Sequence, residues 1–195
     1  TVDELESKIK KMIKYILSGL QQSNYPIGYN EQTNILQQYY KLIHGADNPK
    51  YNLRPSDFIG PSSNTLHQIN MIKNEKTLTP NIMQNYCVTD KADGLRKICF
   101  INDVGRVYLI DMSMNVQFTG AITKNNKIFK SMFDGEHILH DKHKKYINLY
   151  ACFDAYFING KDIRGEVLID ESKMETKTVM RLLECINAVN DLSLE

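Results

Sequence analysis

The sequence lacks most of the features that would assign it to a specialised class. Of its 195 residues none is tryptophan, five are proline and four are cysteine. The cysteines are isolated, without a CxxC pair, which excludes a zinc ribbon or a disulfide-rich scaffold. No apolar run is long enough to span a membrane, and no signal peptide opens the chain. We therefore expect a protein of a reducing, intracellular compartment.

The chain also has no large excess of either charge. Its formal net charge is +1, although 24% of its residues are charged. Bulk electrostatics therefore give no indication of nucleic-acid binding, and any such contact must come from a local patch. Hydrophobic residues make up 42%, which is enough to build the core of one domain.

The first part of the chain has helical periodicity. Apolar residues recur at helical spacing from Val2 to Leu20, and Thr1 with Glu4 is typical of a capping box. A second helix is expected after Asn30 as its N-cap, ending at Gly45. We predict that residues 1–45 form a helical preface, or a linker to an upstream domain, and that 46–195 belong to a second unit. That unit opens with a polar connection over 46–63 and a short helix over 64–74.

The pattern changes to short strands after residue 84. Strands are expected over 86–88, 98–101, 106–110, 116–119, 128–137 and 146–157, with a hairpin turn over 102–105. Ser172 and Glu175 then form a capping-box pattern before a last helix. The predicted class is α+β, with an antiparallel-rich sheet between helices.

One hexapeptide, Lys91-Ala92-Asp93-Gly94-Leu95-Arg96, carries the clearest chemistry. A lysine is a nucleophile only when deprotonated, and burial or a neighbouring cation favours the neutral amine. Arg96 could supply that cation and a planar fork for phosphate or ribose oxygens. Asp93 could orient the turn, and Gly94 permits a backbone conformation that other residues resist. The alternative is an ordinary Asp-Gly turn beside a solvated lysine.

Two further motifs follow in a strand context, Phe133-Asp134-Gly135-Glu136 and Cys152-Phe153-Asp154. Each is weak alone, but their order and spacing after the lysine motif resemble the covalent nucleotidyltransferase superfamily. That superfamily contains mRNA capping enzymes and ATP-dependent ligases. The resemblance covers roughly residues 63–190, and the segment Phe58-Ile59-Gly60-Pro61 through Thr65-Leu66 also looks like the stretch that precedes the lysine motif in capping enzymes. It implies a ligase- or capping-enzyme-like nucleotidyltransferase domain.

The resemblance also implies roles for individual residues. Lys91 would be the catalytic nucleophile, which holds a nucleoside monophosphate as a phosphoramidate. Arg96 would contact sugar or phosphate, Glu136 would contact the ribose or a metal, and Phe153 would stack on the base. Thr89, Asp93 and Gly94 would complete the nucleotide-binding set, whereas Asp134, Gly135 and Asp154 would support the site. The expected cofactor is Mg²⁺ or Mn²⁺.

The position two residues before the lysine favours GTP over ATP. Many ATP-dependent ligases carry glutamate there, whereas this chain has Thr89, as in capping enzymes of large DNA viruses. The resemblance thus implies a guanylyltransferase that uses GTP and a 5′-diphosphate mRNA. The alternatives are the adenylation domain of an ATP-dependent DNA or RNA ligase, and a non-catalytic docking module of a capping complex.

The later motifs of the superfamily, an acidic DG-type strand and a lysine-rich motif, do not occur before Glu195. The OB-fold domain that follows them is also missing, so 46–195 would be the front part of the nucleotidyltransferase domain. By resemblance, we expect a triphosphatase and a guanine-N7 methyltransferase fused in the same polypeptide and no membrane association. The expected location is the host cytoplasm, a viral factory or the virion.

Three histidines, His137, His140 and His143, recur at a spacing of three beside Asp141, which suggests a zinc site. The segment 138–145 is more typical of a polar hairpin loop, because no second cluster supplies further ligands. Lys142, Lys144 and Lys145 make the same loop basic, which usually indicates only a solvated turn.

Overall fold

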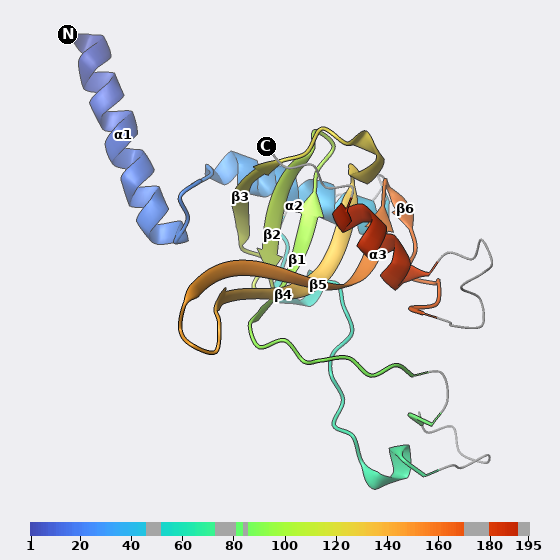
Figure 1. Ribbon diagram of the computed structural model, residues 1–195. Helices are drawn as coiled ribbons and strands as arrows, with labels where there is room; N and C mark the ends of the chain where they lie inside the picture. The colour runs from blue at the N-terminus through green and yellow to red at the C-terminus, as the bar shows by residue number, and fades with distance from the viewer. Residues whose placement is uncertain (46–51, 73–80, 84–85, 170–179, 191–195) are drawn as a thin grey trace.

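Figure 1 shows a computed structural model of the chain, which describes residues 1–45, 52–72, 81–83, 86–169 and 180–190. Two α-helices, α1 (Val2–Gln21) and α2 (Tyr29–His44), precede the sheet, and α3 (Arg181–Asn190) follows it. Three short 3-10 segments are η1 (Pro55–Asp57), η2 (Gln68–Asn70) and η3 (Asn126–Ile128). Among the described residues, no helix is both long enough and apolar enough to cross a membrane.

A six-stranded sheet forms the body of the molecule. Its strands are β1 (Leu95–Ile101), β2 (Arg106–Asp111), β3 (Val116–Ile122), β4 (Ser131–His140), β5 (Tyr146–Ile158) and β6 (Lys161–Asp162). Their order in the sheet is β3-β2-β1-β4-β5-β6, and every neighbouring pair is antiparallel. The predicted α+β class with an antiparallel sheet is thus confirmed, and so is the hairpin around residues 102–105.

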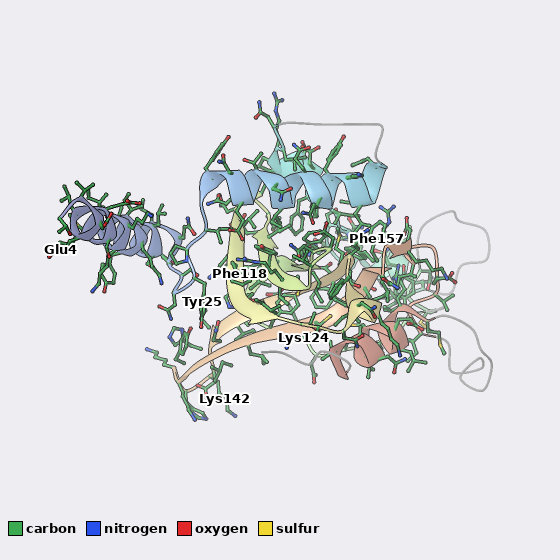
Figure 2. All side chains as sticks on the ribbon, turned by 90° about the horizontal axis from the view of Figure 1, so that it is seen from above. Glu4, Tyr25, Phe118, Lys124, Lys142 and Phe157 are labelled. Carbon is green, nitrogen blue, oxygen red and sulfur yellow. The ribbon has the colours of Figure 1, made fainter. Side chains whose placement is uncertain are left out.

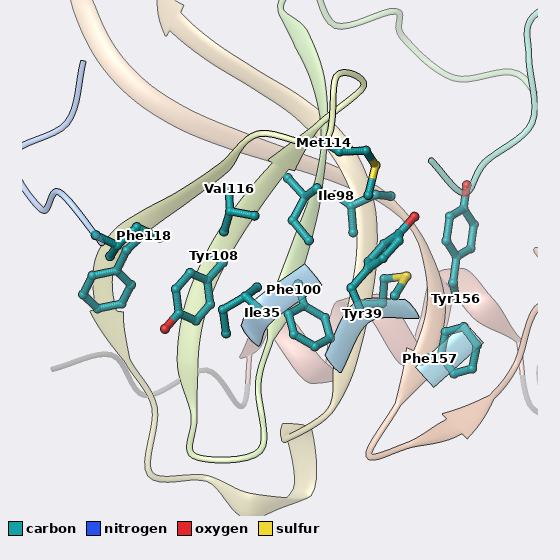
Figure 3. Close-up of a cluster of buried hydrophobic side chains, with 13 residues drawn as sticks. Ile35, Tyr39, Ile98, Phe100, Tyr108, Met114, Val116, Phe118, Tyr156 and Phe157 are labelled. Atoms are coloured by element: carbon teal, nitrogen blue, oxygen red, sulfur yellow. The ribbon is translucent and has the colours of Figure 1, made fainter. Parts of the chain in front are cut away.

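Each face of the sheet carries its own apolar core, because successive strand residues point to opposite sides. Helix α2 covers one face, where Ile35 and Tyr39 pack with Ile98 and Phe100 of β1 (Figure 3). Helix α3 covers part of the other face, where its residue Cys185 joins a cluster that contains Cys99 and Ile101. The Sγ atoms of Cys152 on β5 and Cys185 on α3 lie 2.7 Å apart, which places α3 directly against β5.

Helix α1 differs from the other two helices because none of its residues is buried. It begins as predicted, with the Oγ1 of Thr1 accepting a hydrogen bond from the backbone N–H of Glu4. Its apolar stripe, which includes Leu5 and Ile9, stays exposed, and the helix extends away from the sheet (Figure 1). Helix α2 instead shares a core with the sheet, and the proposed division at residue 45 remains a prediction.

Several predicted boundaries are wrong for identifiable reasons. Helix α2 begins at Tyr29, so Asn30 lies inside the helix and Gly28 is the N-cap. The side chain of Gln21 binds both the N–H and the C=O of the buried Ile27, which fixes the chain just before the helix without a side-chain cap.

Three other expectations concern short segments. Residues 86–88 form no strand, and the side chains of Tyr86 and Val88 are exposed instead of joining the core. Of the helix expected over 64–74, the described part contains only the 3-10 turn η2, and residue 128 ends η3 rather than opening a strand. The capping box of Ser172 and Glu175 lies outside the described residues.

Candidate active site

A buried carboxylate, that of Asp134 on β4, organises the candidate site. Its side chain is fully buried and binds Arg96 on β1 through two hydrogen bonds, Nε to Oδ1 at 3.0 Å and Nη2 to Oδ2 at 2.5 Å. The hydroxyl of Tyr156 on β5 donates to Oδ2 at 2.5 Å. The hydrogen bonds to Asp134 raise the pKa of Arg96 above its usual range, so the guanidinium is permanently charged. Side chains from three neighbouring strands, β1, β4 and β5, therefore meet at one carboxylate, and Arg96 neutralises its charge.

A segment that precedes the lysine motif closes over Arg96. Nη1 of Arg96 donates to the carbonyl of Pro61 at 2.6 Å, and its guanidinium lies 5.8 Å from the centre of the Phe58 ring. Gly60 has a φ of +140°, and a Cβ there would lie 2.3 Å from Nη2 of Arg96. Only glycine permits this backbone to approach the guanidinium so closely. Arg96 is thus fixed from both the sheet and the loop.

The carboxylate of Glu136 lies beside this cluster and is incompletely satisfied. Glu136 is the Cα partner of Arg96 across β1 and β4, so both side chains project from the same face of the sheet. Its Oε2 atom is buried and has no hydrogen-bond partner among the described residues. Leaving a buried acceptor without a donor costs free energy, which a bound cation or donor group would recover.

The lysine motif forms the irregular segment that leads into β1. Thr89, Lys91 and Asp93 are exposed there, and the Nζ of Lys91 lies 3.5 Å from the carbonyl of Ala92. Gly94 anchors the segment, since a Cβ at this residue would lie 2.7 Å from the backbone oxygen of His137 on β4. The chain between Lys91 and the first residue of β1 can span at most about 14 Å. Lys91 therefore lies near the start of β1, where Arg96 pairs with Glu136 of β4.

The second motif, Asp134-Gly135-Glu136, needs its glycine for a structural reason. Gly135 lies beneath the ring of Tyr150, where a Cβ would approach the ring to 2.5 Å. The Tyr150 hydroxyl accepts from the N–H of Cys99 at 3.2 Å and lies within hydrogen-bonding distance of the carbonyls of Lys97 and Phe133. The glycine of the Asp-Gly-Glu motif thus leaves room for a tyrosine that joins β5 to the two central strands.

The third motif contributes one exposed and one anchored side chain. Phe153 on β5 is 38% exposed and has no Cα partner on β4, because the register shifts between Asp134 and Gly135. Asp154 is the Cα partner of Asp134, and its Oδ1 lies 3.1 Å from Nε of Arg181 on α3. Burial raises the pKa of Asp154, and the charge of Arg181 opposes that rise. Asp154 therefore anchors α3, and Phe153 offers an aromatic face.

Sequence reasoning did not assign Tyr156 to the site, although this residue completes the environment of Asp134. The sequence does indicate this residue, because Tyr156 lies two positions after Asp154 in a predicted strand, so both side chains are expected on the same face. The zinc alternative has no support among the described residues, which contain no group of three potential metal-binding side chains. A magnesium ion needs only one or two protein carboxylates when phosphates supply other ligands, and the unpaired Glu136 oxygen fits that requirement.

Comparison with known proteins agrees with this geometry. The sequence model of the family described as "mRNA capping enzyme, catalytic domain" matches residues 60–185, from the glycine that packs on Arg96 to the cysteine of α3. The chain belongs to this family. It is also 28% identical over 163 residues to the probable mRNA-capping enzyme of Acanthamoeba polyphaga mimivirus. The alignment covers 84% of this chain, and the chain spans 12% of the length of that relative. The predicted resemblance to capping enzymes is confirmed.

Proposed function

We propose that this capping-enzyme chain carries the front part of a guanylyltransferase site, in which Lys91 accepts GMP from GTP. The observation that carries the proposal is the arrangement around the start of β1. The segment that contains Lys91 packs closely against the backbone of β4 at Gly94. It continues directly into Arg96, whose Cα partner on β4 is Glu136. A nucleophile, a fixed cation and an unpaired carboxylate oxygen thus gather around the start of β1.

In the first step, the neutral Nζ of Lys91 attacks the α-phosphate of GTP. An N–P bond forms, the bond from the α-phosphorus to the bridging oxygen breaks, pyrophosphate leaves and the amine proton passes to solvent. Three of the five N–H donors of Arg96 bind Asp134 and Pro61, which leaves two for ribose or phosphate oxygens. Because its partners hold it in place, Arg96 contributes positioning and charge without reorganisation.

The remaining side chains would hold the nucleotide. Phe153 offers its exposed ring to the guanine base, and Thr89 and Asp93 flank Lys91 in the same segment. Glu136 would hold Mg²⁺ or Mn²⁺ together with the phosphates, and such an ion neutralises charge on phosphate oxygens. The described residues contain no group of three His, Cys, Asp or Glu side chains placed to hold a metal ion, so the phosphates would supply the other ligands.

In the second step, an oxygen of a 5′-diphosphate RNA attacks the phosphorus of lysyl-GMP. The N–P bond breaks, the proton returns to Lys91 and a GpppN cap is released. The RNA diphosphate must come from removal of a terminal phosphate, and the cap guanine is then a methyl acceptor. We therefore propose that triphosphatase and guanine-N7 methyltransferase activities accompany this chain, in the host cytoplasm, a viral factory or the virion.

The test is covalent labelling. The 195-residue chain, and any longer polypeptide in which it occurs, are incubated with GTP or ATP labelled at the α-phosphate and Mg²⁺, and are then denatured. The expected result is acid-labile label from GTP, lost in Lys91→Ala and retained in a control variant of the exposed lysine, Lys161→Ala. Label that comes from ATP alone would indicate a ligase instead. Absence of label from every folded polypeptide would overturn the catalytic proposal and favour a docking module.

A further inference from the structure

A second constellation of polar side chains lies on the opposite face of the same strands. Lys97 and His137 neighbour Arg96 and Glu136 in the sequence, so strand alternation turns them to the other side of the sheet. The ammonium group of Lys97 donates to Oε1 of Gln117 at 3.1 Å and contacts Nδ1 of His137 at 3.0 Å. Because an ammonium group only donates, Nδ1 accepts, and Nε2–H of His137 donates to Oδ1 of Asn148 at 2.8 Å. Burial lowers the pKa of His137, in agreement with a neutral ring.

This constellation forms the floor of a cleft of about 1050 Å³. One wall is the β4–β5 hairpin, from which His137, Leu139, Tyr146 and Asn148 line the cleft. The opposite wall is the end of α1 and the connection to α2, residues 18–25, where Tyr25 packs on Phe118 at the edge of the sheet (Figure 2). The cleft is also lined by Leu95 and Arg96, so it reaches the start of β1 and the last two residues of the lysine motif.

The tip of the hairpin supplies positive charge. Residues 137–148 contain three lysines against one aspartate, an excess of two positive charges, whereas the whole chain carries only +1. The Oδ1 atom of Asp141 accepts from the N–H groups of His143 and Lys145, so this carboxylate shapes the turn. Lys142, Lys144 and Lys145 are exposed, and no ion pair forms between them and a described acidic residue. Lys142 lies on the side of the sheet away from α2 (Figure 2).

Aromatic surface lies next to this charge. The side chain of Tyr146 is 62% exposed and lines the cleft, and its ring centre lies 5.7 Å from that of His140 across the hairpin. Lysines that track phosphates, combined with aromatic faces on which bases stack, are what single-stranded nucleic acids require. At the floor, the hydrogen-bonding partners of Lys97 are neutral side chains, but Asp111, its Cα partner on β2, also lines the cleft and interacts with its charge, so the phosphates are assigned to the hairpin lysines.

We propose that this cleft and the lysines of its hairpin hold the acceptor RNA, with phosphates at the hairpin tip and a base against Tyr146. The proposal rests on the proposed guanylyltransferase function and adds the surface that its RNA substrate uses. The 5′ end of the strand then points toward the lysine motif, because the cleft continues to Leu95 and Arg96.

The first experiment measures RNA binding without GTP, so its result does not depend on whether Lys91 reacts. The 195-residue chain is titrated against a fluorescent single-stranded RNA at several salt concentrations. The variant Lys142→Gln/Lys144→Gln/Lys145→Gln should bind about tenfold more weakly, and the slope of log K against log salt should be shallower by about 2, for three lost phosphate contacts. The control variant Lys124→Gln/Lys127→Gln/Lys161→Gln removes the same charge from the β3–β4 connection and from β6, and should bind like the wild type.

A second pair of variants tests stacking. Tyr146→Ala should weaken RNA binding and Tyr146→Phe should restore it, whereas Tyr15→Ala on the exposed face of α1 should have no effect. The proposal is overturned if the wild-type chain does not bind RNA, or if the hairpin and control lysine variants lose affinity equally. In an active polypeptide the hairpin variant should form lysyl-GMP normally and transfer GMP to RNA more slowly. If the hairpin variant loses lysyl-GMP formation as well as GMP transfer, the proposal is also overturned.

Discussion

Replacing Arg96 with alanine should destabilise the fold strongly, apart from any effect on catalysis. The substitution removes two hydrogen bonds and the countercharge from Asp134, which is fully buried. Breaking a buried ion pair by removing one partner costs about 3–5 kcal/mol, because the other charge stays buried without compensation. Such a loss is a large share of the 5–15 kcal/mol that is typical of a domain, and it corresponds to a Tm decrease of roughly 6–20 °C at this chain length.

The chain contains a matched control for this prediction. Arg164 binds Asp162 with the same 2.5 Å separation between Nη2 and Oδ2, but 36% and 47% of these two side chains are exposed. Exposed ion pairs contribute about 0–1 kcal/mol, so Arg164→Ala should change the free energy of unfolding little. Burial, and not the length of the contact, is the difference between the two pairs.

Urea unfolding followed by far-UV circular dichroism measures both variants, since the chain has no tryptophan to report by fluorescence. The double variant Arg96→Ala/Asp134→Ala should lose less stability than the sum of the single variants, because the unpaired charge is gone. Tyr156→Phe should cost about 1.5–3 kcal/mol as the loss of one hydrogen bond to a charged acceptor. A loss below about 1 kcal/mol for Arg96→Ala would contradict the assignment of Asp134 as a buried anion.

Three further predictions concern single contacts. Gly135→Ala should lower stability by about 1–3 kcal/mol, because its Cβ would overlap the ring of Tyr150, and thermal unfolding will show whether it does. Gly60→Ala should displace the guanidinium of Arg96 and reduce lysyl-GMP formation even at saturating GTP, a loss that single-turnover labelling measures. Burial lowers the pKa of His137, so the unfolded state binds a proton more readily, and stability should fall as pH drops below about 6.5. In the variant His137→Asn this decrease in stability should be smaller. If Tm depends on pH in the same way in the variant and in the wild type, the prediction is refuted.

Strand periodicity carries most of the fold information in this sequence. The hairpin between β1 and β2 and the long β4–β5 pair follow from alternation and turn residues. The predicted start of α2 is wrong because Asn30 looks like a capping residue, whereas the contact between Gln21 and Ile27 fixes the chain so that Gly28, two residues earlier, is the N-cap. That contact joins a side chain to the backbone six residues later, which helix periodicity and capping patterns do not predict.

The candidate site, like the fold, can be predicted only in part from local sequence patterns. The ordered motifs place Lys91, Arg96 and Glu136 in one region, but not the partners of each side chain. Sequence reasoning gave Arg96 to the nucleotide, whereas in the structure three of its donors bind Asp134 and Pro61. Those partners lie 38 and 35 residues away in the chain, so the pairing depends on the register of β1 with β4 and on the path of the loop that contains Pro61. The nucleotide roles of these residues remain predictions.

The placement of both sites on the same strands leads to a last prediction, about RNA length. Lys91 lies at most about 14 Å of chain from Leu95, where the cleft begins. Leu95 pairs with His137 on β4, and the first hairpin lysine, Lys142, follows His137 by five residues, roughly 16 Å of extended chain. A short acceptor such as a 5′-diphosphate dinucleotide could react at Lys91 without reaching the hairpin, whereas an acceptor of about 16 nucleotides would reach it. The Lys142→Gln/Lys144→Gln/Lys145→Gln variant should therefore transfer GMP normally to the short acceptor and slowly to the long one. An equal defect with both acceptors would mean that the hairpin acts on the nucleotide site through the sheet and not through RNA.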